Sequence, residues 1–257
     1  MYRDSAESPQ NKANVVEQFT NKTADIICQA LSQRIRRGEF AAQGRLPGER
    51  QLSEQFATTR ITLREALGQL EAQGLIYREL RRGWFIAPPR LVYNPLHRSH
   101  FHAMAQRQGR AANTEVIDAH VAAVSHELAD KLAMSEGEEV FRIRRLRRID
   151  GRAVLYVEHY LNPRYFPGLL ELDLTQSLTD LYLTRYGIRY GRVRFTMLPG
   201  PVPPLAAPLL KVAAGSPALF ITRINRDQHD RIIDCDCEYW RYDALCVDVE
   251  AQGVLGG

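Results

Sequence analysis

Two arginines and two threonines are spaced so that a helix could use them to hold DNA. Arg60 and Arg64 are four residues apart, so a helix would carry both guanidinium groups on one face, opposite a row of leucines. Thr59 and Thr62 flank the pair with hydroxyls that can reach phosphate oxygens or base edges. Taken alone, the same residues would also suit a solvated helix face. The spacing predicts a DNA-contacting helix where the surrounding sequence supports one.

A second group of charged residues could hold a small ionic ligand. Arg145 and Arg147 would stand about 7 Å apart on one face of a strand, where planar guanidinium groups suit a phosphate, phosphonate or carboxylate. Asp234, Asp236 and Glu238 alternate along a later strand, so their carboxylates would share one face. A pocket between the two rows would complement a zwitterion. An exposed edge strand with alternating, paired charges is the alternative for each row.

Residues for catalysis or metal binding do not form a recognisable set. Cys235, Cys237 and Cys246 are close in sequence, but zinc-type spacing and a fourth ligand are missing. Reduced, buried thiols of a cytoplasmic protein are the favoured interpretation, and a redox role stays open. The nucleophile and zinc-protease motifs G-x-S-x-G and H-E-x-x-H are absent. We therefore expect no catalytic residues, no metal and no cofactor.

The elements around the first arginine pair predict a winged helix-turn-helix. Three helices and a β-hairpin within about 65 residues are typical of this module, whose third helix enters the major groove. Arg81 and Arg82 would lie at the tip of the hairpin. The expected elements are helices at Thr23–Arg37, after Leu46–Arg50 and at Arg60–Gln73, and strands at Leu75–Arg78 and Trp84–Ala87.

Beyond residue 98 the pattern predicts a mixed α+β domain. Asp150-Gly151 between two apolar runs is a strong hairpin signal. The prolines between 201 and 208 disfavour the last of the expected helices. The expected strands are Val116–Val124, Val140–Ile149, Ala153–Tyr160, Val193–Leu198, Ala218–Asp227 and Arg231–Tyr239, and the expected helices are Phe101–Gln108, Glu127–Leu132, Ser177–Tyr186 and Leu205–Leu210.

Charge is distributed unevenly along the 257 residues. Residues 20–90 hold 12 Lys and Arg against 7 Asp and Glu, whereas residues 91–257 hold 20 of each, a pattern typical of a nucleic-acid reader joined to a neutral domain. No apolar run approaches the ~20 residues that span a membrane, and the polar N-terminus is no secretory signal. We expect a flexible leader at 1–19, a winged helix-turn-helix domain at 20–88, a linker at 89–98, a second domain at 99–250 and a tail at 251–257.

Residues 46–85, LPGERQLSEQFATTRITLREALGQLEAQGLIYRELRRGWF, resemble the DNA-binding domain of the GntR regulators. That family's pattern is leucine-proline-serine-glutamate-arginine, then serine/threonine-arginine-x-threonine-x-arginine-glutamate-alanine-leucine, then a glycine-bearing wing. Gly48 departs from the family's serine, which implies a weaker helix cap. The resemblance implies that Arg50, Arg60 and Arg64 are the principal DNA contacts, assisted by Thr59, Thr62, Gly83 and the wing-tip residues Arg81 and Arg82.

The second half resembles the UTRA sensor domain of the HutC branch of GntR regulators. The matching stretches are QGRAANTEV, GEEVFRIRRLRRIDGRAVLYVEHY, FPGLLELDLTQSLTDLY, RYGI and DCDCEYWRYDALCVDVE. The resemblance implies an antiparallel sheet with flanking helices, similar to chorismate lyase, that binds its effector on the sheet. Thr179 departs from the tyrosine often found at its position. The implied ligand positions are Arg145, Arg147, Ser177 and the Phe101-His102 helix start for an anion, and Glu158, Asp234 and Trp240 for the rest; Asp236 and Glu238 are added from their alternation.

These features predict a ligand-responsive transcription regulator rather than an enzyme. Within the family the sequence looks similar to regulators of phosphonate utilisation, so we expect a homodimeric repressor that is released from a palindromic operator by 2-aminoethylphosphonate or a near relative. Sugar-phosphate, amino-sugar and histidine catabolism are the alternative pathways. A chorismate-lyase-like enzyme fused to a DNA-binding head is the alternative from a different class, and a constitutive architectural DNA binder is a third.

Overall fold

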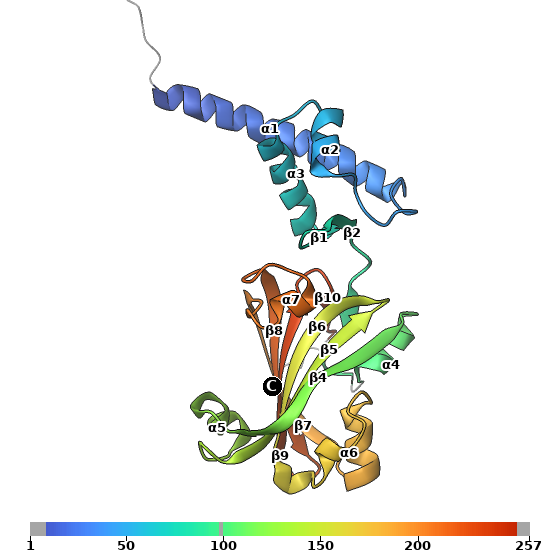
Figure 1. The fold of residues 1–257 in the computed structure, drawn as a ribbon, viewed down its shortest axis with the longest axis vertical. Coiled ribbons are helices and arrows are strands. Elements are labelled where there is room, and N and C mark those ends of the chain that lie inside the picture. Colours follow the sequence, from blue (N-terminus) through green and yellow to red (C-terminus); the bar gives the residue numbers. More distant parts are fainter. Residues whose placement is uncertain (1–8, 98–99, 251–257) are drawn as a thin grey trace, which may run out of the picture. The chain divides into compact units, whose positions relative to one another are not determined.

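A computed structural model describes residues 9–97 and 100–250, which fall into two compact units divided between Pro88 and Pro89 (Figure 1). The predicted tail at 251–257 and residues 1–8 of the predicted leader lie outside the described residues. Within the described ranges, no helix is both long and apolar enough to cross a membrane. Each unit has hydrophobic clusters of its own, so each is described separately.

The first unit has the predicted three helices and wing. Leu52, Leu63 and Leu67 are fully buried and pack with Ile27 and Leu31 of the first helix, because their helical spacing places them on inward faces. The elements are α1 (Pro9–Arg36), α2 (Glu49–Gln55), α3 (Arg60–Ala72), β1 (Ile76–Glu79) and β2 (Gly83–Ile86), with β1 and β2 antiparallel.

Capping residues set where α2 and α3 begin. The Thr59 hydroxyl accepts a hydrogen bond from the Thr62 amide at 3.2 Å and caps α3, as the threonine in the turn predicts. Gly48 precedes α2 without a side-chain cap, which agrees with the weaker capping expected from its departure from serine.

The expectation of a flexible leader over 1–19 is wrong for residues 9–19. These residues form the first turns of α1, which begins with Pro9 at a position where a missing N–H costs nothing. No glycine or further proline interrupts residues 10–36, so the helix continues through the polar stretch.

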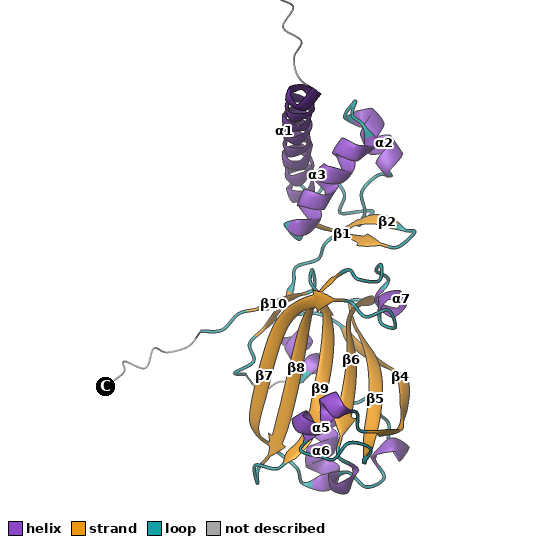
Figure 2. Cartoon of the chain, turned by 90° about the vertical axis from the view of Figure 1, so that its left-hand side faces the viewer, coloured by secondary structure: helices purple, strands orange, loops and turns teal. Residues whose placement is uncertain are grey.

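The second unit is built on a six-stranded antiparallel sheet with the order β4-β5-β6-β9-β8-β7 (Figure 2). All six strands expected from the sequence are present, and the Asp150-Gly151 hairpin joins two of them. The strands are β4 (Ala112–Ala123), β5 (Glu139–Ile149), β6 (Arg152–Leu161), β7 (Tyr190–Pro201), β8 (Pro217–Asp227) and β9 (Ile232–Arg241).

Helices cover both faces of this sheet and make three layers (Figures 1 and 2). On one face lie α4 (Phe101–Arg107) and α6 (Leu178–Tyr186), packed on clusters that include Val157 and Ile143. On the other lie α5 (His126–Leu132) and α7 (Ala207–Leu210), the latter persisting despite its prolines. Two short 3-10 turns, η1 (Pro163–Tyr165) and η2 (Leu169–Glu171), precede α6.

The predicted linker at 89–98 is not irregular throughout, so the prediction is wrong for part of this segment. Its residues Leu91–Tyr93 form β3, which pairs in parallel with β10 (Leu245–Val247) within the second unit. Leu91 and Tyr93 are buried, which anchors the strand. Three residues are too few for alternation to show in the sequence.

The three cysteines near the C-terminus differ in their exposure to solvent. Cys235 and Cys237 share the α5 face of β9 and are buried there as free thiols. Cys246 on β10 is also free but exposed, so the expectation of a buried thiol is wrong at that position. No grouping of three or more metal-ligating side chains is found in the described part of the chain.

Candidate functional site

The outer face of α3 presents the two arginines that the sequence placed on one helix side. Arg60 and Arg64 are both exposed, and Leu63 behind them is buried. Arg64 Nε donates to Glu49 Oε2 at 2.8 Å, and Trp84 Nε1 donates to Glu49 Oε1 at 3.2 Å. Burial alone would raise the pKa of Glu49, but these two hydrogen bonds and the arginine charge lower it. The carboxylate thus ties α2, α3 and the wing together and orients Arg64.

The expectation that the Thr62 hydroxyl lies on this surface is wrong, because Thr62 is only 6% exposed. Its hydroxyl lies 3.0 Å from that of Thr59, which itself is exposed at the helix start. The sequence analysis did not single out Ile61, which is 78% exposed between the arginine and the buried threonine. An exposed isoleucine on such a face can contact a thymine methyl group.

The wing carries further exposed cations. Arg81 adopts a φ of 62° in the turn that joins β1 and β2, so it lies at the hairpin tip, and Gly83, the first residue of β2, has a φ of 95°. Arg82 pairs with Glu79, and its guanidinium group lies 5.1 Å from the centroid of the Phe85 ring. Arg50, on α2, is 81% exposed and only loosely paired with Glu54 at 3.8 Å.

In the second unit, a row of side chains crosses the sheet beneath α4 and α6. Its members are paired strand by strand: Ile143 on β5, His159 on β6, Asp236 on β9, Arg223 on β8 and Phe195 on β7. His159 Nδ1 lies 2.5 Å from Asp236 Oδ1, and Arg223 donates to Asp236 Oδ2. Burial lowers the pKa of His159 to about 3, so the ring is neutral at neutral pH. The row forms the floor of a cavity.

The Arg145 side chain is buried and donates hydrogen bonds to several neighbouring groups. It is 1% exposed, donates to His159 Nε2 from Nε at 3.0 Å, and donates from Nη1 to the carbonyls of Leu174 and Gln176. Burial lowers its pKa to about 10, which still leaves it charged at neutral pH. These bonds fix the loop that leads into α6. Arg145 therefore lines the cavity and stabilises the loop that precedes α6.

Arg147 faces the same cavity with spare hydrogen-bonding capacity. Its Nε is buried without a hydrogen-bond partner in the described part of the chain, and its guanidinium lies 4.8 Å from the Phe101 ring centroid. Burial and the neighbouring Arg145 lower its pKa to about 9. An unpaired buried donor is costly, and the side chain that carries it lines the cavity. The two arginines predicted together therefore differ in role.

The three carboxylates of β9 share one face, as their alternation predicts, but all three are engaged. Asp234 accepts from Asn225 and Tyr190, Asp236 from His159, Arg223 and Asn225, and Glu238 from Trp240 and Arg223. Burial, followed by the charge of Asp236, raises the pKa of Asp234 to about 8. The sequence grouped these carboxylates correctly but could not show that internal partners occupy them.

Some expected ligand positions lie away from the cavity. Glu158 accepts hydrogen bonds from the hydroxyls of Tyr156 and Tyr160, its neighbours two residues away, and so faces the opposite side of the sheet from His159. Placing it in the cavity is wrong, because alternation along β6 sends adjacent residues to opposite faces. Asp234, Glu238 and Trp240 lie on the cavity side, but beneath or beside its lining.

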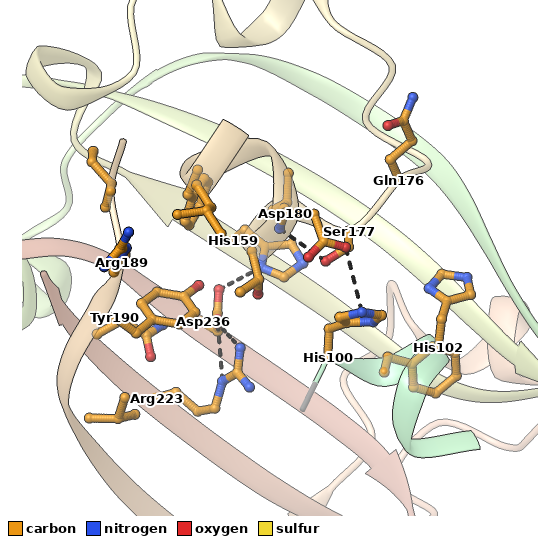
Figure 3. A pocket seen from close by; sticks show the side chains of 18 of the residues that line it. His100, His102, His159, Gln176, Ser177, Asp180, Arg189, Tyr190, Arg223 and Asp236 are labelled. Atoms are coloured by element: carbon orange, nitrogen blue, oxygen red, sulfur yellow. Dashed lines mark hydrogen bonds and ion pairs between the residues drawn. The ribbon is translucent and has the colours of Figure 1, made fainter. Parts of the chain in front are cut away.

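The cavity is lined by residues of α4, α6, β3 and the sheet (Figure 3), and it has a volume of about 330 Å³. This size suits a small metabolite. Phe101 and His102 of α4 and Ser177, the N-cap of α6, line it as expected. Residues that the sequence analysis missed line it too: Tyr93, His100, His159, Asp180, Arg189, Tyr190 and Arg223. In strand Ala218–Asp227, alternation with Ile221 and Asn225 was the available signal for Arg223.

Comparison with known proteins bears on both units. A profile described as the UTRA domain matches residues 107–245, more than half of the chain, and one described as bacterial regulatory proteins of the gntR family matches residues 23–86. The chain belongs to the GntR family. This GntR-family chain is 31% identical over 224 residues to the uncharacterised HTH-type transcriptional regulator YihL of Escherichia coli (strain K12), covering 87% of the chain and 95% of YihL.

Two further relatives of this GntR-family chain agree with that assignment. The HTH-type transcriptional repressor NagR of Bacillus subtilis (strain 168) is 28% identical over 198 residues, 77% of this chain and 81% of NagR. The crystal structure of PhnF from Mycobacterium smegmatis matches with a TM-score of 0.59 at 26% identity, over 81% of this chain and 92% of that one. The chain is therefore a transcriptional regulator of the GntR/UTRA type, and the lyase-like enzyme alternative is not supported.

Proposed function

We propose that this regulator is a repressor of a catabolic operon, released from its operator by a small anionic or zwitterionic metabolite, with 2-aminoethylphosphonate favoured. Arg147 carries the proposal, because its guanidinium faces the cavity with a buried, unpaired Nε. The N-terminus of α6, which begins after Ser177, lines the same cavity and adds the positive end of a nine-residue helix dipole. A phosphonate would satisfy both groups.

On DNA we propose a homodimer that places one α3 in each half of a short palindrome. Arg60, Arg64 and Arg50 would contact phosphates and base edges, and Arg81 or Arg82 the flanking groove. Repression is favoured because NagR carries that name among the relatives. Deleting the regulator should then raise transcription of its target in the absence of effector. A fall in transcription would mean activation instead.

Titration calorimetry with the purified full chain tests the effector class. We expect 2-aminoethylphosphonate to bind. At a free ligand concentration of a hundred times Kd, it should raise the free energy of unfolding by about 2.7 kcal/mol. Arg147→Gln should abolish binding. Arg148→Gln is the matched control, because Arg148 lies on the same strand and pairs with Glu115 at 3.0 Å outside the cavity.

Other ligands give distinct outcomes. Binding of a sugar phosphate or amino-sugar phosphate alone, with the same loss in Arg147→Gln, would keep the pocket and replace the pathway. Binding of an imidazole acid alone would indicate histidine catabolism. No stabilisation by any of these compounds, together with ligand-independent operator binding, would favour the constitutive architectural binder.

A further inference from the structure

The carboxylates of β9 cannot receive a cationic ligand group without breaking the sheet's internal network. Asp236 is 1% exposed, and both of its oxygens already accept from His159 and Arg223. Asp234 is fully buried under Asn225 and Tyr190. An incoming ammonium would have to displace the charge-assisted bond from Arg223 to Asp236, or the buried hydrogen bonds of Asp234. The partner for a cationic group on the effector must lie elsewhere on the cavity wall.

Asp180 is the second carboxylate among the described residues that line the cavity, and its surroundings differ. It lies in the first turn of α6, and its side chain is 62% exposed. The one ion pair found for it, with His100 Nε2, is long at 3.5 Å (Figure 3). Ser177 caps this turn by accepting from the Asp180 backbone amide at 3.3 Å, which fixes the backbone from which the exposed carboxylate projects.

We propose that Asp180 recognises an ammonium group on the effector and takes it in exchange for His100. An ammonium has three donors and no acceptor, so an exposed carboxylate is its natural partner. Arg147 of β5, which lines the same cavity, would hold the anionic end. This inference rests on the proposed function and narrows it: the effector is an anion with an amine a short distance from it. Asp180 then determines specificity.

The test compares two ligands that differ in the amine alone. Calorimetry with the full chain measures the affinities of 2-aminoethylphosphonate and ethylphosphonate. We expect the unaltered chain to prefer the amine by roughly tenfold or more, the size of a hydrogen bond between charged groups. Asp180→Asn should bring this preference close to one while leaving ethylphosphonate affinity little changed. Glu171→Gln, an exposed carboxylate outside the cavity, is the matched control and should keep the preference.

Each of the other possible results would contradict a particular part of this proposal. Equal affinities for the two ligands in the unaltered chain would overturn the assignment of Asp180 and leave a phosphonate-binding regulator. An equal rise of both affinities in Asp180→Asn would mean that Asp180 repels anions rather than recognising an amine. Binding of neither ligand would overturn the proposed effector together with this inference. Thermal melting of each variant verifies that the fold is intact.

Discussion

Arg145 and Arg147 are two residues apart on one strand face, yet the contacts around them predict opposite consequences of removal. Arg145→Ala would leave His159 Nε2 and the carbonyls of Leu174 and Gln176 without their donor, which should cost about 3–5 kcal/mol of unfolding free energy. Arg147→Gln removes a side chain with no internal hydrogen bond at Nε and should cost under about 1 kcal/mol. Urea denaturation of both variants measures the difference. Equal destabilisation would contradict the separate roles.

Asp234 should make stability fall as the pH rises through the neutral range. Its pKa is about 8 in the folded chain and about 3.9 in an unfolded one, so the folded state binds more protons between these values. Stability then decreases with rising pH by up to about 1.4 kcal/mol per pH unit. His159, with a folded pKa of about 3, has the opposite effect below about pH 6.5, where an unfolded histidine gains its proton.

The window from pH 6.5 to 8 therefore separates the effect of Asp234 from that of His159. Asp234→Asn keeps a neutral side chain at this position and should remove the slope there, which is checked by unfolding both chains in urea at several pH values. Parallel curves for the two chains would show that Asp234 is ionised in the folded state at neutral pH.

At the scale of elements, a bulge in β7 brings Tyr190 to the cavity. The register between β7 and β8 shifts between Tyr190 and Val193, and Gly191 sits in this bulge against Asp227. A Cβ on Gly191 would collide with the Asp227 carbonyl oxygen, so the strands could not approach as they do. Gly191→Ala should weaken effector binding at least tenfold by displacing Tyr190. Gly200→Ala, on the same strand with open space around it, should not.

The exposed face of α3 should account for much of the salt dependence of operator binding. Each arginine that contacts a phosphate adds about one to the slope of log affinity against log salt. Arg64→Ala should remove most specific binding and leave effector affinity intact, because Arg64 contacts Glu49 within the first unit. Fluorescence anisotropy over a range of salt concentrations measures both effects. An unchanged operator affinity would remove Arg64 from the interface.

The elements were easier to predict from the sequence than the partners of their side chains. Periodicity placed every strand of the large sheet, and alternation put Arg145 with Arg147 and Asp234 with Asp236 on shared faces. Alternation along its strand indicates the face of Arg223 but not its partner Asp236, because that pairing depends on the register between β8 and β9, which no local pattern encodes. Glu158 was misplaced because resemblance was followed where alternation along β6 pointed the other way. Local patterns predict which face of the sheet a side chain lies on. The pairing of strands decides which charged side chains are left without a partner within the protein.

At the scale of the whole molecule, an effector that releases the operator must be weakened by the operator in turn. If 2-aminoethylphosphonate lowers operator affinity by some factor, thermodynamic linkage requires the operator to lower effector affinity by the same factor, typically 5–150. Calorimetry of the effector with and without operator duplex, set beside anisotropy with and without effector, measures the two factors independently. Arg64→Ala should abolish the operator's effect on effector binding, since it cannot engage the DNA, whereas Arg147→Gln should bind the operator and ignore the effector. If the effector binds equally tightly with and without operator, it does not control DNA binding, and the cavity serves another purpose.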